Sequence, residues 1–388
     1  MGTTRSSILV LVTICFLLAA PPAYSERRGF FRATRLLDAA ASGSGSAQTP
    51  LQMDSSGGAY DMTFSMGTPP QKLSALADTG SDLIWAKCGA CKRCAPQGSS
   101  SYYPNKSSSF SKLPCSSGLC RTLESQSTCA SGAVCDYKYS YGLASDPHHY
   151  TQGYMASETF TLGGDAVRGI GFGCTTMSEG WYGSGSGLVG LGRGKLSLVR
   201  QLKVGAFSYC LTSDTSKSSP LLFGAAGDLM TGAAVQSTPL LKTSYTVNLT
   251  SISIGAATTP GTGRHGIIFD SGTTLTFLAQ PAYTLAKVAL LSQATNLTRV
   301  PGTDGYEVCF QTSGAVFPSM VLHFDGGDMA LRTENYFRAV DDSVSCWIVQ
   351  SSPSHRSIVG NIIQMDYHIR YDLDKSVLSF QAANCETF

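Results

Sequence analysis

Charged side chains are scarce in this sequence. They make up 14% of its 388 residues, against roughly a quarter in an average soluble protein. Lysine plus arginine (28) nearly balance aspartate plus glutamate (26), which leaves a net charge of +2. This balance offers neither the basic surface that binds nucleic acid nor a polyanionic tail. We therefore expect no nucleic-acid partner.

The sequence also lacks the motifs of several hydrolase and cofactor classes. It contains no H-E-x-x-H and no G-x-S-x-G, and its six histidines are scattered or, at His148 and His149, adjacent. No pair of histidines therefore has a helical metal-ligand spacing. Gly185, Gly187 and Gly190 fit G-x-G-x-x-G, but a glycine-rich run without a strand–helix–strand context gives such a match by chance. We expect no metal and no cofactor.

Long apolar runs are missing except at the N-terminus. Arg5 precedes an apolar run from Ile8 to Ala20, and small residues follow it up to Ser25. This pattern is typical of a secretory signal peptide over residues 1–25, and the run is shorter than the ~20 residues that span a bilayer. We therefore expect a secreted, extracellular protein without a stable membrane anchor, with a vacuole or another endomembrane compartment as an alternative destination.

Cysteine usage fits an oxidising compartment. The sequence has thirteen cysteines, and removal of Cys15 with the signal peptide leaves twelve, an even number. The run C-G-A-C-K-R-C at 88–94 has the alternative interpretation of a metal or cluster site, which the signal peptide disfavours. Candidate glycosylation sites are Asn105, Asn248 and Asn296, each in an N-x-S/T sequence.

Residues 26–50 are basic at first and then rich in alanine, glycine and serine. This composition fits a flexible N-terminal segment. It fits equally a propeptide whose cations cover an acidic cleft until the segment is removed. Both interpretations stay open.

The rest of the sequence predicts a mostly β protein. From Leu51 onward, short strand-like runs alternate with glycine and proline turns. Two helices are expected, one at 197–203 with Ser197 as its N-cap and Gly205 past its end, and one at 281–294 with Pro281 in its first turn.

Two similar tetrapeptides are the strongest functional signal. DTGS at 78–81 and DSGT at 270–273 each follow an apolar stretch, and each precedes a hydrophobic pair closed by glycine, at 188–190 and 358–360. One such tetrapeptide usually marks only a turn. Their repetition in matching contexts predicts two similar lobes rather than a short-period repeat.

The first residue of each tetrapeptide, Asp78 or Asp270, is a candidate catalytic group. Two carboxyls that are brought together cannot both ionise easily, so they share a proton. One then activates water as a base, and the other protonates a substrate carbonyl as an acid. Such a pair hydrolyses peptide bonds without a metal or a covalent intermediate.

From about Leu51 to Cys385 the sequence resembles the pepsin-like aspartic proteases, and within them the plant nepenthesin-type group. The resemblance rests on the two tetrapeptides, on G-T-P-P-Q at 67–71, on Trp85 and on Tyr141-Gly142. It implies an all-β, bilobal fold with the active-site cleft between the lobes. The lobes would comprise residues 51–225, with a cysteine-rich insertion at 88–135, and residues 226–388.

The resemblance also implies roles for individual residues. Asp78 and Asp270 would be catalytic, and Tyr141 would be the flap tyrosine, bonded to Trp85. The substrate-binding residues would be Thr79, Gly80, Ser81, Trp85, Tyr141, Gly272 and Thr273. The implied disulfides are Cys88–Cys91, Cys94–Cys174, Cys115–Cys135, Cys120–Cys129, Cys210–Cys385 and Cys309–Cys346.

The expected function is that of a secreted, monomeric aspartic endopeptidase acting on extended polypeptides. By resemblance it has an acidic optimum and prefers apolar residues around the scissile bond. The alternative is a catalytically inactive relative that acts as an inhibitor or binding protein, which the two intact tetrapeptides disfavour. The loop at 142–153 departs from the family's short Gly-Asp-Gly-Ser turn, because it is longer and contains Pro147 and two histidines.

Overall fold

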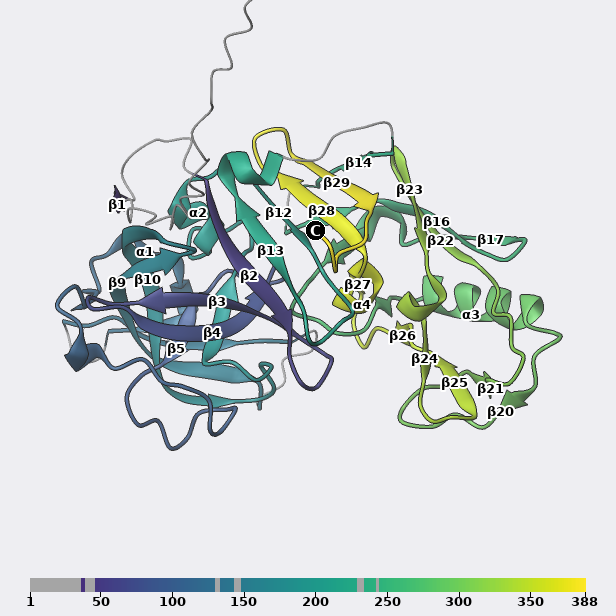
Figure 1. The fold of residues 1–388 in the computed structure, drawn as a ribbon, viewed down its shortest axis with the longest axis horizontal. Helices are drawn as coiled ribbons and strands as arrows, with labels where there is room; N and C mark the ends of the chain where they lie inside the picture. Colours follow the sequence, from purple (N-terminus) through teal and green to yellow (C-terminus); the bar gives the residue numbers. More distant parts are fainter. Residues whose placement is uncertain (1–35, 39–45, 130–132, 143–147, 229–233, 242–243) are drawn as a thin grey trace, which may run out of the picture. The chain divides into compact units, whose positions relative to one another are not determined.

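The computed structural model describes residues 36–38, 46–129, 133–142, 148–228, 234–241 and 244–388 (Figure 1). These residues form strands and turns with few helices, in two lobes, which confirms the all-β, bilobal prediction. The first long strand, β2, begins at Ala47, four residues before the expected start of the first lobe at Leu51. In the described part of the chain, no helix has the length and apolar character needed to cross a membrane.

The largest sheet has the strand order β14-β29-β28-β12-β13-β2-β3-β4-β11-β5-β10-β9-β8-β7, with β1 paired to β10 and β6 to β9. Its strands are β1 (Leu36–Asp38), β2 (Ala47–Met53), β3 (Tyr60–Met66), β4 (Gln71–Asp78), β5 (Trp85–Lys87), β6 (Ser111–Lys112), β7 (Ser127–Thr128), β8 (Asp136–Ser140), β9 (Tyr150–Leu162), β10 (Asp165–Glu179), β11 (Gly187–Gly190), β12 (Ala206–Cys210), β13 (Ser218–Phe223), β14 (Gln236–Pro239), β28 (Tyr367–Asp372) and β29 (Val377–Ala382). Pairing of β12 with β28 joins the two lobes in one sheet.

Three smaller sheets build the rest of the second lobe, in the orders β15-β18-β27-β19-β26, β17-β16-β22-β23 and β20-β21-β25-β24. Their strands are β15 (Thr246–Val247), β16 (Leu249–Ile254), β17 (Ala257–Pro260), β18 (Ile267–Phe269), β19 (Phe277–Leu278), β20 (Arg299–Val300), β21 (Cys309–Gln311), β22 (Met320–Phe324), β23 (Gly327–Leu331), β24 (Phe337–Ala339), β25 (Val344–Trp347), β26 (Gln350–Ser351) and β27 (Ser357–Val359).

Both predicted helices are present. In α2 (Leu198–Leu202), the Ser197 hydroxyl accepts a hydrogen bond from the Arg200 amide, so Ser197 is the N-cap, and Lys203 closes the helix in a left-handed conformation. The second, α3 (Ala282–Gln293), begins directly after Pro281. Two further helices, α1 (Gly118–Thr122) and α4 (Asn361–Gln364), are not predicted from the sequence, and both are little longer than one turn. Single 3-10 turns lie at Pro104–Lys106, Glu124–Gln126, Gly224–Asp228, Gly263–His265 and Thr333–Asn335.

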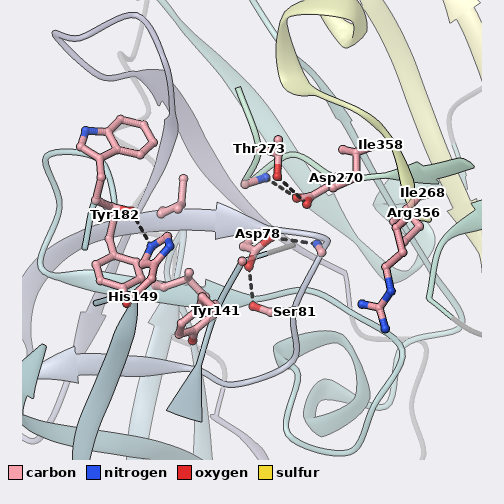
Figure 2. Close-up of a pocket in the computed structure, with 16 residues that line it drawn as sticks. Asp78, Ser81, Tyr141, His149, Tyr182, Ile268, Asp270, Thr273, Arg356 and Ile358 are labelled. Atoms are coloured by element: carbon pink, nitrogen blue, oxygen red, sulfur yellow. Dashed lines mark hydrogen bonds between the residues drawn. The ribbon is translucent and has the colours of Figure 1, made fainter. Parts of the chain in front are cut away.

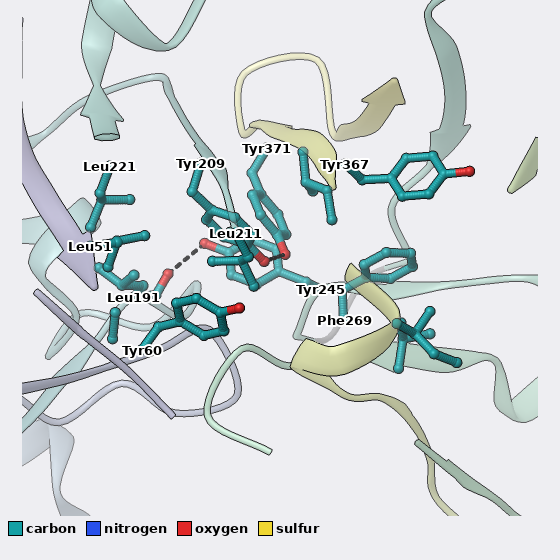
Figure 3. Packing of buried hydrophobic residues seen from close by; sticks show 14 of the residues in the cluster. Leu51, Tyr60, Leu191, Tyr209, Leu211, Leu221, Tyr245, Phe269, Tyr367 and Tyr371 are labelled. Carbon is teal, nitrogen blue, oxygen red and sulfur yellow. Dashed lines mark hydrogen bonds between the residues drawn. The ribbon is translucent and has the colours of Figure 1, made fainter. Parts of the chain in front are cut away.

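A cluster of buried tyrosines packs where strands from both halves of the chain meet (Figure 3). The Tyr209 and Tyr371 hydroxyls lie 2.7 Å apart, and the Tyr209 hydroxyl donates to Gln364 at 2.6 Å. Tyr245 contacts the Tyr371 ring at 4.3 Å between centroids and donates to the Leu191 carbonyl at 2.7 Å. Because buried hydroxyls need partners, these bonds allow large amphipathic rings to fill the centre of the fold.

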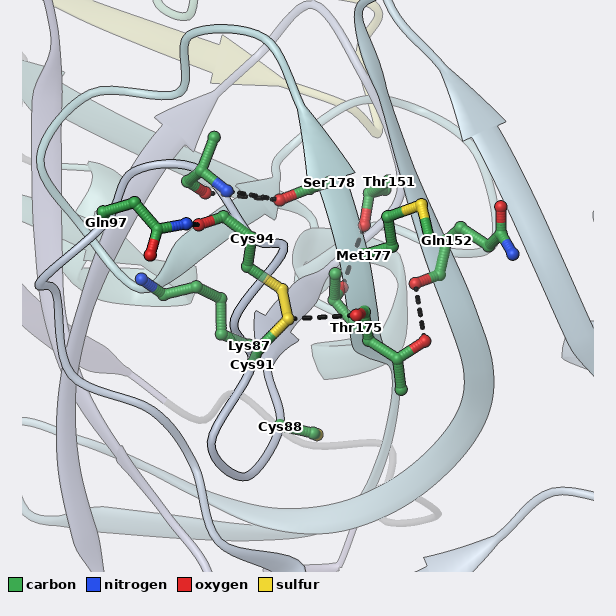
Figure 4. The surroundings of a disulfide bond; sticks show 12 residues. Lys87, Cys88, Cys91, Cys94, Gln97, Thr151, Gln152, Thr175, Met177 and Ser178 are labelled. Carbon is green, nitrogen blue, oxygen red and sulfur yellow. Dashed lines mark hydrogen bonds between the residues drawn. A yellow bond between two sulfur atoms is a disulfide. The ribbon is translucent and has the colours of Figure 1, made fainter.

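Four of the disulfide pairings implied by the resemblance are wrong. The structure pairs Cys88 with Cys174 rather than Cys88 with Cys91 and Cys94 with Cys174. The reason is strand register: β5 runs parallel to β10 with Ala86 opposite Cys174, and the Cys88 amide donates to the Thr175 carbonyl at 3.0 Å. Cys91 is left to pair with Cys94, its neighbour in a tight turn (Figure 4).

The other two disulfides with partners different from those implied lie in the same insertion. Cys120 is carried by α1 to within 5.9 Å, between Cα atoms, of Cys135, and these two residues are bonded. Cys115 pairs with Cys129 instead of Cys135. The last two disulfides, Cys210–Cys385 and Cys309–Cys346, join the pairs that the resemblance implies.

Candidate active site

Two loops of the same construction bring Asp78 and Asp270 together. Asp78 ends β4, which runs parallel to β11 with Ala77 opposite Val189 and Asp78 opposite Gly190. Asp270 follows β18, which runs parallel to β27 with Phe269 opposite Val359. The hydrophobic pairs at 188–190 and 358–360 therefore belong to buried strands beside the two tetrapeptides. Each fixes the path of its neighbouring loop.

Matching hydrogen bonds orient the two carboxylates (Figure 2). The Gly80 amide donates to Asp78 Oδ1 at 2.8 Å, and the Ser81 hydroxyl donates to Asp78 Oδ2. In the second loop, the Gly272 amide donates to Asp270 Oδ1 at 2.8 Å. The Thr273 hydroxyl donates to Asp270 Oδ2 at 2.7 Å. With both side chains held by an amide and a hydroxyl, neither carboxylate is free to rotate.

The glycines of the two tetrapeptides allow the carboxylates to approach each other. A Cβ atom on Gly80 would lie 2.5 Å from the Asp270 carboxyl carbon, and one on Gly272 would overlap the Asp78 carboxylate. Each carboxylate therefore packs against the backbone of the opposite loop. Only a residue without a side chain leaves room for this contact.

Thr79 and Ser271 bond the two loops to each other across the lobes. The Thr79 amide donates to the Ser271 hydroxyl at 3.0 Å, and the Ser271 amide donates to the Thr79 hydroxyl at 2.9 Å. Each hydroxyl donates in turn to a carbonyl of the opposite strand, at Phe269 or Ala77. Thr79 is 1% exposed and does not line the cleft, so its expected contact with substrate is wrong. Thr79 instead holds the two loops in position through its bonds to Ser271.

The flap region also has the expected hydrogen bond. Trp85 Nε1 donates to the Tyr141 hydroxyl at 2.9 Å. The Trp85 ring is fully buried and packs edge-on against Tyr182 at 4.9 Å between centroids. Trp85 thus supports Tyr141 from behind and does not line the cleft, which corrects its expected contact with substrate. Residues 143–147 of the unusual loop, including Pro147, lie outside the described residues.

A cavity of about 170 Å³ lies over the carboxylates (Figure 2). Asp78, Gly80, Ser81, Tyr141, Asp270, Gly272 and Thr273 line it, so seven of the nine expected catalytic and substrate-binding residues meet there. Its apolar walls come from both lobes, with Leu76 and Leu188 on one side and Ile268 and Ile358 on the other. Such a hollow with a few convergent polar groups suits a ligand-binding site.

Burial raises the pKa of Asp78 well above its usual value, and the neighbouring Asp270 carboxylate raises it further. Hydrogen bonds from Ser81 and Gly80 oppose this shift. Two carboxyls in contact and shielded from water retain one proton between them. The arrangement can therefore supply an acid and a base side by side.

Several residues of the site carried no signal in the sequence. Asn361, the first residue of α4, is fully buried and donates from Nδ2 to the Gly58 and Ser271 carbonyls, both at 3.1 Å. Trp181 likewise lines the cavity beside Tyr141. His149, one of the two histidines that make the loop at 142–153 unusual, lines it too, and its imidazole Nε2 lies 3.1 Å from the Trp181 carbonyl. In the described part of the chain, no three His, Cys, Asp or Glu side chains are clustered as metal ligands.

Comparisons with known proteins agree with this geometry. Two family models, described as xylanase inhibitor N-terminal and xylanase inhibitor C-terminal, match residues 60–225 and 244–382. Aspartic proteinase nepenthesin-1 of Nepenthes gracilis is 42% identical over 349 residues, which cover 84% of this chain and 78% of that protein. The chain belongs to the nepenthesin-type aspartic proteases. Aspartic proteinase nepenthesin-2 of the same plant is 38% identical, over 91% of this chain and 84% of its own length.

Solved structures share the fold of this nepenthesin-type protease at low identity. Conglutin gamma from lupine seeds superimposes with a TM-score of 0.71 at 19% identity, over 87% of this chain and 95% of its own. Basic 7S globulin from soybean gives a TM-score of 0.71 at 19% identity, over 88% and 97%. The relatives named as proteinases make the protein a hydrolase of the aspartic endopeptidase class, whereas the structural neighbours support only the fold.

The Trp85–Tyr141 hydrogen bond gives the first testable prediction. Tyr141→Phe keeps the ring but leaves the buried Trp85 Nε1 without an acceptor, a loss of roughly 1–2 kcal/mol. We expect kcat/KM for a peptide substrate to fall about tenfold. Tyr150→Phe, which removes a half-buried hydroxyl on β9, is the matched control. Equal kcat/KM in the Tyr141→Phe variant and the wild type would show that this bond does not position the flap.

A second buried carboxyl lies one strand away from the catalytic loop. Asp61 on β3 stands opposite Leu76 and accepts a hydrogen bond from the Ser184 hydroxyl at 3.0 Å. Burial, more than the nearby Asp54 carboxylate, raises the pKa of Asp61 from 3.8 to about 6. The folded protein therefore holds this proton at pH values where the unfolded chain has released it. The contribution of Asp61 to the free energy of unfolding therefore falls as the pH rises from about 3.8 to 6.

Asp61→Asn should remove this pH dependence. A shift of about two pKa units corresponds to roughly 2–3 kcal/mol, so we expect the variant to exceed the wild type in unfolding free energy by that amount at neutral pH. Near pH ~3.5, where the carboxyl is protonated in both states, the two proteins should be similar. Denaturant titrations at both pH values test this, with the exposed Asp304→Asn as control. A variant less stable than the wild type at neutral pH would contradict the prediction.

Proposed function

We propose that this protease cleaves extended polypeptides with Asp78 and Asp270 as its catalytic pair. The observation that carries the proposal is the contact of each carboxylate with the glycine of the opposite loop. This contact holds the two acids within reach of one water molecule. The buried bonds between Thr79 and Ser271 keep that separation fixed.

The pair supplies every proton transfer of the reaction. With one proton between them, the ionised carboxyl takes a proton from water as the water oxygen attacks the peptide carbonyl carbon. The protonated carboxyl gives its proton to the carbonyl oxygen, which produces an uncharged tetrahedral diol. When the C–N bond breaks, the amine nitrogen takes up a proton from the pair and the diol oxygen returns one. The enzyme is then in its starting state.

The same features support an acidic working range and an apolar preference. The pair works only while it holds a single proton, and loss of that proton at higher pH leaves no acid. Apolar substrate side chains beside the scissile bond would contact Leu76, Leu188, Ile268 and Ile358. Burial of such side chains contributes roughly 25 cal/mol per Å² of apolar surface.

The alternative is an inhibitor or binding protein without catalysis, the activity printed in the description of the matching family models. That function does not need a paired carboxylate site. Here both tetrapeptides are intact and their side chains are held by matching hydrogen bonds. Catalysis is therefore the better explanation of the site.

Secretion and processing belong to the proposal as well. The N-terminal apolar run supports a cleaved signal peptide, and the basic segment after it supports a propeptide or flexible tail. Asn105 and Asn296 are exposed, as glycan attachment requires. Asn248 is half-buried and donates to Asp325 at 2.9 Å, which makes it the weakest of the three candidate sites.

The test is an assay of the purified mature protein on an acid-denatured protein between about pH 3 and 6. We expect new N-termini that follow or precede apolar residues, and none from a variant carrying Asp270→Asn. Mapping of the cleavage sites by mass spectrometry gives the side-chain preference. No hydrolysis by a folded wild-type protein anywhere in this range would favour the inhibitor.

A further inference from the structure

A second cavity of about 420 Å³ opens beside the catalytic one in the second lobe. Ile268 and Arg356 line both cavities, so the two lie next to each other. The second cavity lies at the beginning of the parallel strands β18 and β27, whereas Asp270 follows the end of β18. A substrate that extends along this side of the cleft would pass from one cavity to the other.

Three basic residues, His265, His355 and Arg356, line this second cavity. His265 ends the turn before β18, and His355 and Arg356 directly precede β27, so strand pairing places them at one edge of the sheet. The other polar groups on the lining are the hydroxyls of Ser244, Thr246 and Ser357. No aspartate or glutamate is found among the described residues that line it.

Arg356 is the group best placed to act on a substrate. Its side chain is exposed and forms no ion pair with any described residue. Figure 2 shows it on the opposite side of Asp78 from His149 and Tyr182. An unpaired guanidinium carries five donors in a planar fork that matches a carboxylate.

We propose that Arg356, with His265 and His355 around it, forms a subsite that binds an acidic side chain of the substrate. The inference rests on the proposed function, because the ligand is a residue of the peptide being cleaved. The three residues of β18 separate this edge from Asp270 by about 10 Å. The preferred glutamate or aspartate therefore lies roughly two to four positions from the scissile bond.

The subsite gives the enzyme a specificity that the apolar walls over Asp78 and Asp270 do not provide. Apolar contacts select side chains at the scissile bond and leave more distant positions undetermined. A charged subsite further along the cleft selects polypeptides in which an acidic residue lies at a fixed distance from the apolar pair. Because Arg356 is exposed, salt weakens this selection.

The experiment compares matched peptides with glutamate or glutamine moved through each position flanking one scissile bond. It is run at low ionic strength and about pH 5.5, where a free glutamate side chain is ionised. In the wild type, we expect glutamate to raise kcat/KM about fivefold over glutamine at a single position. Arg356→Gln should bring this ratio to about one at that position; the ratio is taken within each variant, because Arg356 also lines the cavity over Asp78 and Asp270. Arg338→Gln removes the same charge from an exposed site on β24 and should keep the ratio.

Failure of the subsite and failure of the proposed function are distinguishable. If the wild type cleaves none of the peptides, the proposed function is wrong. If it cleaves them with equal kcat/KM for glutamate and glutamine at every position, or if Arg356→Gln keeps the wild-type ratio, the protease assignment stands and the subsite is wrong.

Discussion

Asp78→Asn and Asp270→Asn are each expected to reduce kcat/KM for a peptide substrate by roughly 10³-fold or more. Asparagine keeps the shape of the side chain but cannot carry or release the proton that the pair shares. The Gly80 or Gly272 amide can still donate to the asparagine oxygen, and the neighbouring hydroxyl can accept from the asparagine NH2 group, so the loop geometry should survive. The loss should appear in kcat, since both proton transfers belong to the chemical step.

The control for this prediction is Asp304→Asn, which removes an exposed carboxyl far from the tetrapeptides in sequence. It should have wild-type kcat/KM. Both active-site variants should unfold at temperatures within a few degrees of the wild type. More than about a hundredth of wild-type turnover in either variant would mean that the residue does not belong to the catalytic pair.

Gly272→Ala is expected to cost about 100-fold or more in kcat/KM while it leaves every titrating group in place. The added methyl group would overlap the Asp78 carboxylate, so the two carboxyls must move apart. Displacement of about 1 Å in a catalytic group reduces rates by ~10²-fold. The backbone of Gly272 does not have a positive φ, so the effect is steric and not conformational.

Gly118→Ala is the matched control, because a Cβ on Gly118 has no neighbour within 4 Å. The test measures kcat/KM of both variants on one fluorescence-quenched peptide and the thermal unfolding of each variant. Activity of the Gly272→Ala variant above about a tenth of the wild type, in a protein of unchanged stability, would show that close contact of the carboxylates is unnecessary.

The two loops that carry Asp78 and Asp270 could be predicted from sequence because their determinants are local. An aspartate at a strand end, a glycine two residues later and a hydroxyl after it specify the loop, and the buried pairs at 188–190 and 358–360 specify the strand beside it. Helices α2 and α3 were predictable for the same reason, from Ser197 and Pro281 at their first turns. The disulfides of the cysteine-rich insertion were not, because Cys88 meets Cys174 only through the register of β5 against β10.

The sequence also did not predict the roles of residues whose contacts lie in distant parts of the chain. Thr79 looks like any cleft residue in the sequence, and only the contact of the two loops shows that it is buried against Ser271. Asn361 and Arg356 lie near the second hydrophobic pair but follow no periodic pattern that assigns them a role. The position of Arg356 depends on the pairing of β18 with β27. The contact of Asn361 depends on the Gly58 carbonyl, which comes from the other lobe and accepts its hydrogen bond.

The double variant Asp78→Asn/Asp270→Asn tests the central claim most directly, through its kcat/KM beside those of the two single variants on one peptide. If the carboxyls act as one proton-sharing unit, removing the second after the first costs little more, and all three variants should agree within about tenfold. If each carboxyl acted independently, the two losses would multiply, and the double variant would fall roughly 10³-fold below either single one. Multiplying losses would contradict the shared-proton mechanism.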